Sequence, residues 1–236
     1  MLPSVQAQFN GTFVWGNNTA GYLKTATYHQ GPPSGAGSVR QSGDSYNISA
    51  TSDSVIQYAV IQASPTKNEY LAGHQKADGR LDIFQCKRNC DEVDDWRLIG
   101  TFTAAQTSAN ATRRAFDIAY EGISGKALVV FANNAVGNTP NRAYYCIWDG
   151  YRWSPAPNCD TTFTAGSGNE IVWSDTSGGM GVPQWISLKG WKNEILLGVS
   201  GTRGFALGLW DKEVMNWSTT ANFTASAGTA LATLSA

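Results

Sequence analysis

Short runs in which apolar and polar residues alternate cover most of the chain, with Gly, Asn, Ser or Pro between them. The clearest set lies from Phe116 to Trp153, where FDIAY, KALVVF and AYYCIWDGYRW follow one another, separated by a Gly-Ile-Ser-Gly turn and a polar loop. Alternation over about five residues between turn residues is typical of antiparallel strands. We therefore predict an all-β fold built from antiparallel sheets.

The same order of strands occurs on both sides of this set. Three runs lead to Trp96 and three lead to Trp217, and in both cases Asn-Glu opens the second run. These runs are residues 58–63, 69–74, 81–85, 185–188, 194–199 and 205–210. The closing tryptophans Trp96, Trp153 and Trp217 recur about every 60 residues, which predicts a repeat of sheet modules.

The two ends of the chain resemble parts of the central unit. Residues 13–18 align with 129–134 and keep the Asn pair, whereas residues 219–236 resemble 101–120. We therefore predict one module split between the N- and C-termini. The chain is then a single domain, 1–236, of about four sheets, either propeller-like blades or β-sandwich-like modules. The complete modules are 53–98, 101–159 and 161–218, with partial modules at 9–31 and 219–236. Residues 32–52, rich in Gly, Ser and Pro, are interpreted as a long connector.

Low charge narrows the range of partners. Only 15% of the residues are charged and the net charge is -1, so electrostatics does not favour nucleic acid or an anionic membrane. No apolar run of 18 residues exists, and we predict no membrane span. The first residues, MLPSVQAQF, lack a basic and a long apolar region, and Val5-Gln6-Ala7 resembles the end of a signal-cleavage site. We expect a start near a mature N-terminus.

Cysteines and sequons both favour an extracellular protein. Cys86 with Cys90 and Cys146 with Cys159 form two close pairs, for which we predict two disulfides rather than free thiols. Zinc is disfavoured because the two histidines, His29 and His74, are not near either pair; both are interpreted as surface or strand residues. Six sequences match the glycosylation acceptor N-x-S/T, at Asn10, Asn17, Asn47, Asn110, Asn216 and Asn222.

The alternation of two kinds of unit resembles a known class. Ser64–Gly73 reads SPTKNEYLAG and Phe116–Phe131 reads FDIAYEGISGKALVVF, with a WDGxxW ending at 148–153. These residues resemble the repeats of large secreted bacterial and archaeal β-propeller-like proteins, over about residues 9–236. The resemblance implies a propeller-like architecture and leaves the activity open. Only 148–153 has the full ending; Asp211 is followed by Lys212, and a Cys loop precedes Trp96.

The Trp-Asp-Gly-Tyr-Arg-Trp ending is interpreted as structural. Asp-Gly supports a tight hairpin, and the flanking tryptophans are expected to pack between neighbouring sheets. Stacking of these tryptophans on a ligand is the alternative. Tyr151 and Arg152, in the turn itself, are expected to be exposed and are the candidate ligand contacts.

The sequence contains few candidate catalytic residues. Ser174-Asp175 does not complete the aspartate turn of sialidase-type propellers, although a Tyr120-Glu121 pair exists. Asp117 and Glu121 are candidates for the carboxylate pair of a glycoside hydrolase, which needs closeness only in space. No nucleophile elbow, phosphate loop, dinucleotide fingerprint or HExxH is present. We predict that the protein is not an enzyme and has no cofactor.

One further acidic cluster lies beside Cys90. Asp91, Glu92, Asp94 and Asp95 form a loop whose spacing is not that of an EF-hand. A solvated loop is favoured over a calcium site, and no metal is expected.

The C-terminal segment suggests how the protein could assemble. Residues 219–236 are uncharged and lack Pro, so they suit an added strand, with Asn222, Phe223, Leu231 and Leu234 as the strand donor. The segment would close the ring of its own chain or enter the next molecule. We expect a non-catalytic extracellular structural or adhesive surface protein, such as a filament subunit joined to copies of itself by strand complementation. The alternatives are a lectin-like propeller that binds surface glycans and a secreted glycoside hydrolase.

Overall fold

The computed structural model describes residues 10–16, 22–30, 39–48, 54–87, 90, 92–102, 114–132, 142–154, 159, 162–163, 169–172, 181–211 and 216–224. Regular structure in these residues is β, except for the short 3-10 helix η1 (Val93–Asp95). The predicted all-β class with antiparallel sheets is therefore confirmed. None of these residues forms a helix long and apolar enough to cross a membrane.

The strands form four sheets, antiparallel throughout except for one short parallel pair, β7 with β12. The first sheet contains β1 (Asn10–Gly16), β2 (Leu23–Gln30) and β3 (Val39–Asn47). The second contains β4 (Ile56–Ala63), β5 (Glu69–Lys76), β6 (Leu81–Lys87), β7 (Trp96–Phe102) and β12 (Thr162–Phe163). The third contains β8 (Phe116–Tyr120), β9 (Ala127–Phe131), β10 (Arg142–Trp148) and β11 (Trp153–Ser154), with β13 (Asn169–Val172) also paired to β10. The fourth contains β14 (Pro183–Trp191), β15 (Glu194–Gly201), β16 (Gly204–Asp211) and β17 (Asn216–Thr224).

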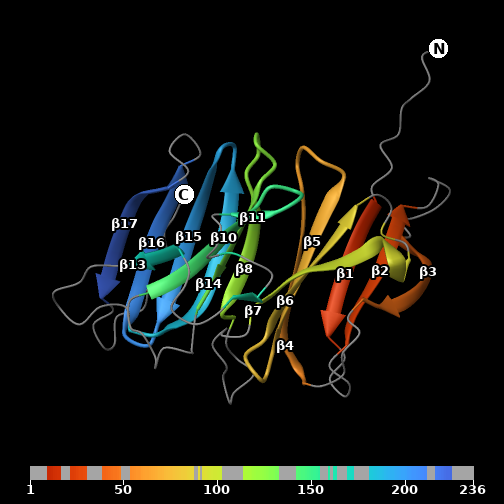
Figure 1. The fold of residues 1–236 in the computed structure, drawn as a ribbon, viewed down its shortest axis with the longest axis horizontal. Helices are drawn as coiled ribbons and strands as arrows, with labels where there is room; N and C mark the ends of the chain where they lie inside the picture. Colours follow the sequence, from red (N-terminus) through yellow and green to blue (C-terminus); the bar gives the residue numbers. More distant parts are fainter. Residues whose placement is uncertain are drawn as a thin grey trace, which may run out of the picture.

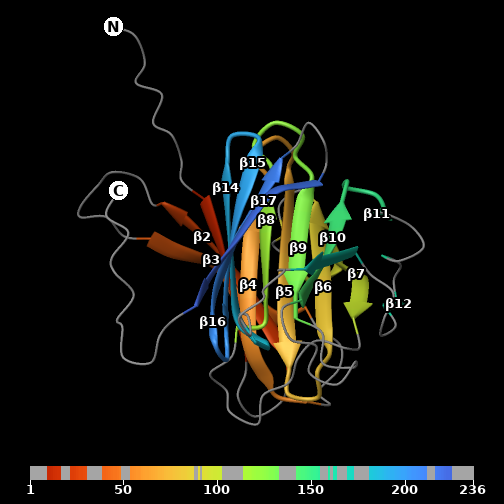
Figure 2. The same cartoon turned by 90° about the vertical axis from the view of Figure 1, so that its left-hand side faces the viewer.

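The sheets stand in a row in chain order, and the first strand of each lies beside the first strand of the next (Figure 1). Turned by 90°, the blue strands of the fourth sheet lie in front of the others (Figure 2). An isolated parallel bridge joins Arg114, just before β8, to Trp185 of β14. Antiparallel sheets packed around a row of inner strands form a propeller-like arrangement. We call the four sheets blades 1 to 4 and the strands β1, β4, β8 and β14 the inner strands.

Apolar side chains fill the spaces between consecutive blades. Three buried clusters lie between blades 1 and 2, 2 and 3, and 3 and 4. Strand β8 contributes side chains to two of these clusters, because its alternate residues face blade 2 and blade 4. All five of its residues are buried. Each fully buried large apolar side chain contributes about 1.5–3 kcal/mol to the folded state. Packing between blades is thus the main source of stability.

The closing tryptophans occupy equivalent places in three blades. Each stands at the start of a fourth strand, opposite the end of the third, in the pairs Cys86↔Trp96, Trp148↔Trp153 and Trp210↔Trp217. The Trp153 ring meets the Phe102 ring edge-on, with centroids 5.6 Å apart, and its indole N–H donates to the Ile99 carbonyl at 2.7 Å. Trp148 and Trp153, which flank the Asp-Gly turn, both lie in the buried cluster between blades 2 and 3, so their predicted packing between sheets is confirmed.

Both predicted disulfides are present. Cys86 is bonded to Cys90, and Cys146 to Cys159, with Cα–Cα distances of 5.8 and 5.7 Å. The first closes the loop at the end of β6, and the second ties the segment after β11 back to β10.

The predicted connector at 32–52 is wrong in its middle, because β3 forms there. This strand is the edge of blade 1 and pairs with β2 across a bulge. An edge strand needs backbone pairing on one side only, so its polar sequence VRQSGDSYN gives no alternating signal.

The module split between the chain ends is also wrong for the described residues. Strand β1, aligned in the sequence with a later strand of the central unit, is the inner strand of blade 1 and lies beside β4. Strand β17 pairs with β16, which places Phe223 opposite Phe205 and Asn222 opposite Ala206. The proposed donor residues Asn222 and Phe223 therefore complete their own blade. Leu231 and Leu234 lie outside the described residues.

Blades 3 and 4 approach most closely at two glycines. A Cβ on Gly190 would lie 2.5 Å from the Tyr120 carbonyl oxygen, and one on Gly122 would lie 2.2 Å from the Lys192 carbonyl oxygen. The Gly122 N–H donates to that Lys192 carbonyl. A side chain at either position would push the two backbones apart.

We expect Gly190→Ala to lower the free energy of unfolding by about 1–3 kcal/mol, because the methyl group overpacks the blade 3–4 contact. Thermal unfolding followed by circular dichroism measures the change. The matched control is Gly198→Ala, whose Cβ would lie 3.5 Å from the Phe205 ring, an ordinary contact. Equal melting temperatures for the two variants would contradict the role given to Gly190.

Candidate functional site

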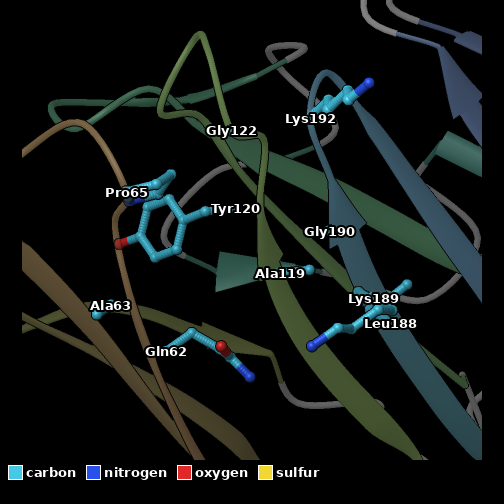
Figure 3. A pocket seen from close by; sticks show the side chains of 10 residues that line it. All are labelled: Gln62, Ala63, Pro65, Ala119, Tyr120, Gly122, Leu188, Lys189, Gly190 and Lys192. Atoms are coloured by element: carbon cyan, nitrogen blue, oxygen red, sulfur yellow. The ribbon is translucent and has the colours of Figure 1, made fainter.

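The carboxyl ends of the inner strands β4, β8 and β14 surround a pocket of about 230 Å³. The short loops that follow these strands complete its wall. The lining residues, drawn in Figure 3, are Gln62, Ala63, Pro65, Ala119, Tyr120, Gly122, Leu188, Lys189, Gly190 and Lys192. Because three blades contribute, the pocket exists only when these blades are packed in register.

The polar side chains of the pocket are an amide and two amines. Gln62 is half-buried on β4, while Lys189 on β14 and Lys192 in the next turn are exposed. The Gln62 amide and the Lys189 ammonium group extend toward each other across the pocket, whereas Lys192 extends outward at the rim (Figure 3). None of the ten lining residues is acidic. The pocket can therefore donate hydrogen bonds and offer positive charge.

The Tyr120 ring forms part of the pocket wall, whereas its hydroxyl is hydrogen-bonded to Glu69. The hydroxyl donates to Oε1 of Glu69 at 2.9 Å. Burial, together with the negative charge and hydrogen bond of Glu69, raises the pKa of Tyr120 well above its usual value, so the phenol stays protonated. Tyr120 is a buried structural donor rather than an acid or base for a ligand.

Side chains of blade 2 hold the Asp149-Gly150 turn of blade 3. The Lys67 ammonium donates to the carbonyls of Gly125 and Asp149 at 3.0 and 2.7 Å. The Lys87 ammonium donates to the Gly150 carbonyl at 2.9 Å. Gln85 donates to the same carbonyl at 3.1 Å and also to Glu69. These contacts fix the hairpin that the Trp-Asp-Gly sequence forms.

Tyr151 and Arg152, the predicted ligand contacts, lie exposed at the tip of this hairpin. The Tyr151 side chain is 82% exposed, and the Lys87 ammonium lies 4.2 Å from its ring centroid. The Arg152 guanidinium pairs with the Asp149 carboxylate at 3.3 Å. Their exposure agrees with the expectation, whereas a ligand at the tip stays a prediction.

Asp117, the first candidate of the hydrolase pair, bridges blades 3 and 4. Its Oδ2 accepts hydrogen bonds from the Arg114 guanidinium and the Leu188 backbone N–H, both at 2.8 Å, and its Oδ1 accepts from the Ile118 N–H at 3.0 Å. The residue is 1% exposed. Burial raises the pKa of Asp117 above its usual value, although these hydrogen bonds and the Arg114 charge oppose the shift.

Glu121, the second candidate, joins the same two blades. Its carboxylate accepts the Trp210 indole N–H at 2.7 Å and the Ser124 hydroxyl, and the residue is 2% exposed. Neither Asp117 nor Glu121 lines the pocket. The structure uses both as buried connectors between blades and does not expose them as a pair.

The acidic loop beside Cys90 forms a small turn. Glu92 and Asp94 are exposed, and the Asp95 carboxylate accepts the Glu92 backbone N–H at 3.3 Å. Asp91 lies outside the described residues. Among the residues that are described, no three His, Cys, Asp or Glu side chains are grouped to hold a metal ion.

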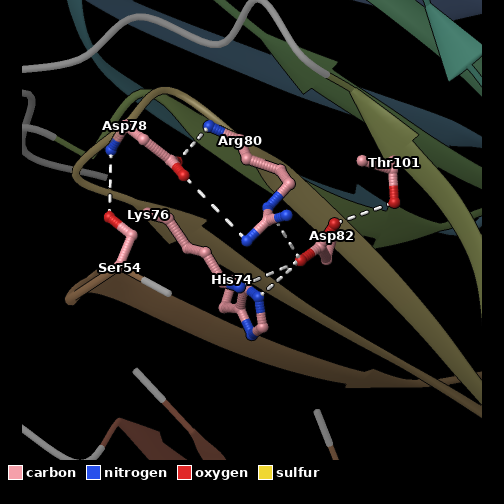
Figure 4. Close-up of polar contacts among 7 residues, drawn as sticks. All are labelled: Ser54, His74, Lys76, Asp78, Arg80, Asp82 and Thr101. Atoms are coloured by element: carbon pink, nitrogen blue, oxygen red, sulfur yellow. Dashed lines mark hydrogen bonds and ion pairs between the residues drawn. The ribbon is translucent and has the colours of Figure 1, made fainter. Parts of the chain in front are cut away.

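His74 belongs to a buried charged cluster at the β5–β6 hairpin (Figure 4). Its Nε2 lies 3.0 Å from Oδ2 of Asp82, and the Lys76 ammonium and Arg80 guanidinium each lie 3.6 Å from that oxygen. The Thr101 hydroxyl donates to the other Asp82 oxygen at 2.8 Å. The sequence indicated a surface or strand position for His74; it lies on β5 and is fully buried. His29 lies on β2.

This cluster shifts two pKa values. Burial, together with the charges of Lys76 and Arg80, lowers the pKa of His74 below 6.5 in spite of its Asp82 contact. Burial alone would raise the pKa of Asp82, but the hydrogen bonds from His74 and Thr101 and the charge of Lys76 outweigh it and hold that pKa below 3.8. At neutral pH the cluster contains a neutral imidazole and an ionised Asp82.

The glycosylation candidates are spread over the strands. Asn47 is exposed at the end of β3, Asn10 begins β1, and Asn216 and Asn222 lie on β17. Asn17 and Asn110 lie outside the described residues.

Sequence reasoning did not single out Gln62, Lys189 or Lys192. They come from two blades separated by more than 100 positions in the sequence, so no local motif joins them. The one available signal is the pair of lysines around Trp191 at a hairpin, in a chain with only 17 basic residues.

Comparisons with known proteins show a shared fold rather than a family. No protein-family model and no curated protein matches the chain. The structure is similar to exo-β-1,3-galactanase from Phanerochaete chrysosporium, solved with β-1,3-galactotriose, with 12% identity and a TM-score of 0.50 over 92% of this chain and 48% of the galactanase. The chain thus spans about half the length of that enzyme. The six-bladed β-propeller lectin of Aleuria aurantia also matches, with 15% identity and a TM-score of 0.40 over 93% of this chain and 63% of the lectin.

The prediction that the protein is not an enzyme is wrong. It rested on the absence of a local catalytic motif, but the fold is shared with an enzyme, an exo-β-1,3-galactanase. The carboxyl groups of a glycoside hydrolase need only be close in space, so the absence of a local motif is a poor criterion for activity.

We expect the buried His74 to make stability depend on pH. Because its pKa is lowered in the folded state, the unfolded chain takes up a proton first as the pH falls below about 6.5. The free energy of unfolding should then decrease by up to about 1.4 kcal/mol per pH unit. Asp82 keeps its contribution until the pH falls below about 3.8.

Urea unfolding of the wild type and of His74→Gln between about pH 7 and 4.5 isolates this effect. The wild type should lose stability relative to the variant across that window, because Gln does not titrate. Asp117, whose raised pKa acts in the opposite direction, is present in both proteins and cancels in the difference. Parallel curves would show that His74 accepts its proton in the folded state.

Proposed function

We propose that the protein binds carbohydrate in the pocket at the carboxyl ends of the inner strands. The observation that carries the proposal is the lining, in which an amide and two amines stand among ring, aliphatic and backbone groups. Sugars need this mixture, because each unit has both hydroxyls and an apolar face. Trp191 does not line the pocket, but it lies between the lining residues Gly190 and Lys192 in the sequence and is 65% exposed, so we take its ring as the candidate for such a face.

Two further observations support a secreted glycan-binding protein. The galactanase of similar fold was solved with a β-1,3-linked galactotriose, which makes galacto-oligosaccharides the first ligands to test. Two disulfides are typical of proteins outside the cytosol, where surface and extracellular glycans occur.

Cleavage of the bound glycan is a second step that the similarity to a galactanase favours. Glycoside hydrolysis commonly uses two carboxyl groups on opposite sides of the scissile bond. The described pocket wall has no acidic residue, and Asp117 and Glu121 are buried. Binding and product formation should therefore be measured on the same samples.

We expect the wild type to bind an oligosaccharide on a glycan array, and Trp191→Ala to weaken that binding about tenfold or more, a loss of about 1.4 kcal/mol. Titration calorimetry measures the affinity and chromatography of the products detects cleavage. Tyr151→Ala is the matched comparison, since it removes an exposed aromatic ring at the hairpin tip.

A loss of affinity in Trp191→Ala together with unchanged affinity in Tyr151→Ala would support a ligand at the pocket. A loss confined to Tyr151→Ala would move the site to the hairpin that the sequence indicated. No binding and no cleavage of any glycan would overturn the proposed function.

Self-association of an adhesive surface protein is the second candidate function. On β14, Ile186 and Leu188 face blade 3, so Trp185 faces away from it, and Trp185 and Leu196 of blade 4 are 48% and 47% exposed. Phe13 and Trp15 of blade 1 are 55% and 37% exposed. Exposed apolar patches mark contact sites. These two faces continue the series of blade contacts, and we expect them to join copies head to tail.

Replacement of Trp185 by Ser should shift the protein toward monomers in sedimentation velocity. Leu98→Ser is the control, because Leu98 is 51% exposed on β7, away from both end faces. A wild type that stays monomeric at every concentration would contradict this candidate. Because β17 already completes blade 4, the test does not depend on strand exchange.

A further inference from the structure

We infer that the sugar bound in the pocket is acidic, with a carboxylate held by Lys189 across from Gln62. The inference rests on the proposed carbohydrate binding and specifies the class of sugar, a uronic acid unit within an oligosaccharide. It follows from the charges around the pocket.

The ammonium groups of Lys189 and Lys192 have no ionic partner among the residues that the structure describes. No ion pair joins Lys189 or Lys192 to an acidic side chain of the described residues, and the Lys192 ammonium lies 5.9 Å from the Trp191 ring centroid. By contrast, Lys67 and Lys87 each donate to backbone carbonyls. The charges of Lys189 and Lys192 are therefore available to a ligand.

The carboxylates nearest the pocket are buried and do not line it. Glu69, Asp117 and Glu121 lie on or beside the strands that form the pocket, but each is buried and accepts hydrogen bonds from its own neighbours. The Arg114 guanidinium also pairs with Asp117 at 2.8 Å. These carboxylates reduce the positive potential, yet none lines the pocket or neutralises Lys189 by contact.

The two hydrogen-bond donors, the Lys189 ammonium and the Gln62 amide, lie on opposite sides of the pocket. Lys189 and Gln62 extend toward one another from β14 and β4 (Figure 3). A carboxylate has two oxygens and accepts from both donors at once, whereas a neutral sugar hydroxyl gains less from the ammonium charge. Lys189 is exposed, so water and salt screen it partly, and we expect a moderate preference rather than an absolute one.

The test compares trigalacturonic acid with neutral α-1,4-linked galactotriose, which has the same linkages and lacks only the carboxylates. Calorimetry at about 20 mM and about 300 mM salt should show about tenfold tighter binding of the acidic trisaccharide at low salt and a smaller ratio at high salt. Lys189→Gln should remove most of the preference, because it should weaken binding of the acidic trisaccharide more than binding of the neutral one. Because Lys189 is exposed, the variant should keep the melting temperature of the wild type.

Lys24→Gln is the matched control, since it lowers the net charge by one on β2 of blade 1, away from the pocket. A similar loss in both variants would attribute the preference to overall charge and overturn the inference. Equal binding of the two trisaccharides, unaffected by Lys189→Gln, would overturn the acidic class but keep carbohydrate binding. No binding of either trisaccharide, or of any array glycan, would overturn both.

Discussion

The contact between blades 3 and 4 is the constraint on which the candidate site depends. Two buried carboxylates cross it: Asp117 accepts the Leu188 backbone N–H, and Glu121 accepts the Trp210 indole N–H. Gly122 and Gly190 allow the backbones to approach closely enough for both. A buried carboxylate that lost these donors would carry the full cost of desolvation, so the blades can pack stably only in this register.

The pocket is a consequence of this register. Leu188, which is tied to Asp117, precedes Lys189, so the hydrogen bond that aligns the blades also sets the position of the ammonium group. On the other wall, Tyr120 is held by Glu69 of blade 2. The polar groups of the pocket are thus few and half-buried or exposed, while the groups that position them are buried and hydrogen-bonded. Such support is what a pre-formed binding site requires.

The sequence predicted the repetitive part of the fold well and the site poorly. Alternation located the strands β4 to β6, β8 to β10 and β14 to β16, and the spacing of Trp96, Trp153 and Trp217 marked the start of the fourth strand in three blades. It failed at β3, whose single pairing edge allows a polar sequence, and at β1, whose similarity to a later strand concealed its inner position. Gln62 and Lys189 meet only through the packing of blades, which no local pattern encodes.

The buried acids Asp117 and Glu121 show that the sequence alone does not distinguish a structural carboxylate from a catalytic one. In a chain with 15% charged residues, Asp117 on β8 and Glu121 directly after it were the candidates for a hydrolase carboxylate pair. Both carboxylates instead bind donors of blade 4, the Leu188 backbone N–H and the Trp210 indole N–H. The cationic side chains at the pocket, in contrast, have no acidic partner within the part of the chain that the structure describes. The few charged residues thus have two different roles. The buried acids connect the blades, whereas the exposed amines of the pocket are the groups that we propose bind a ligand.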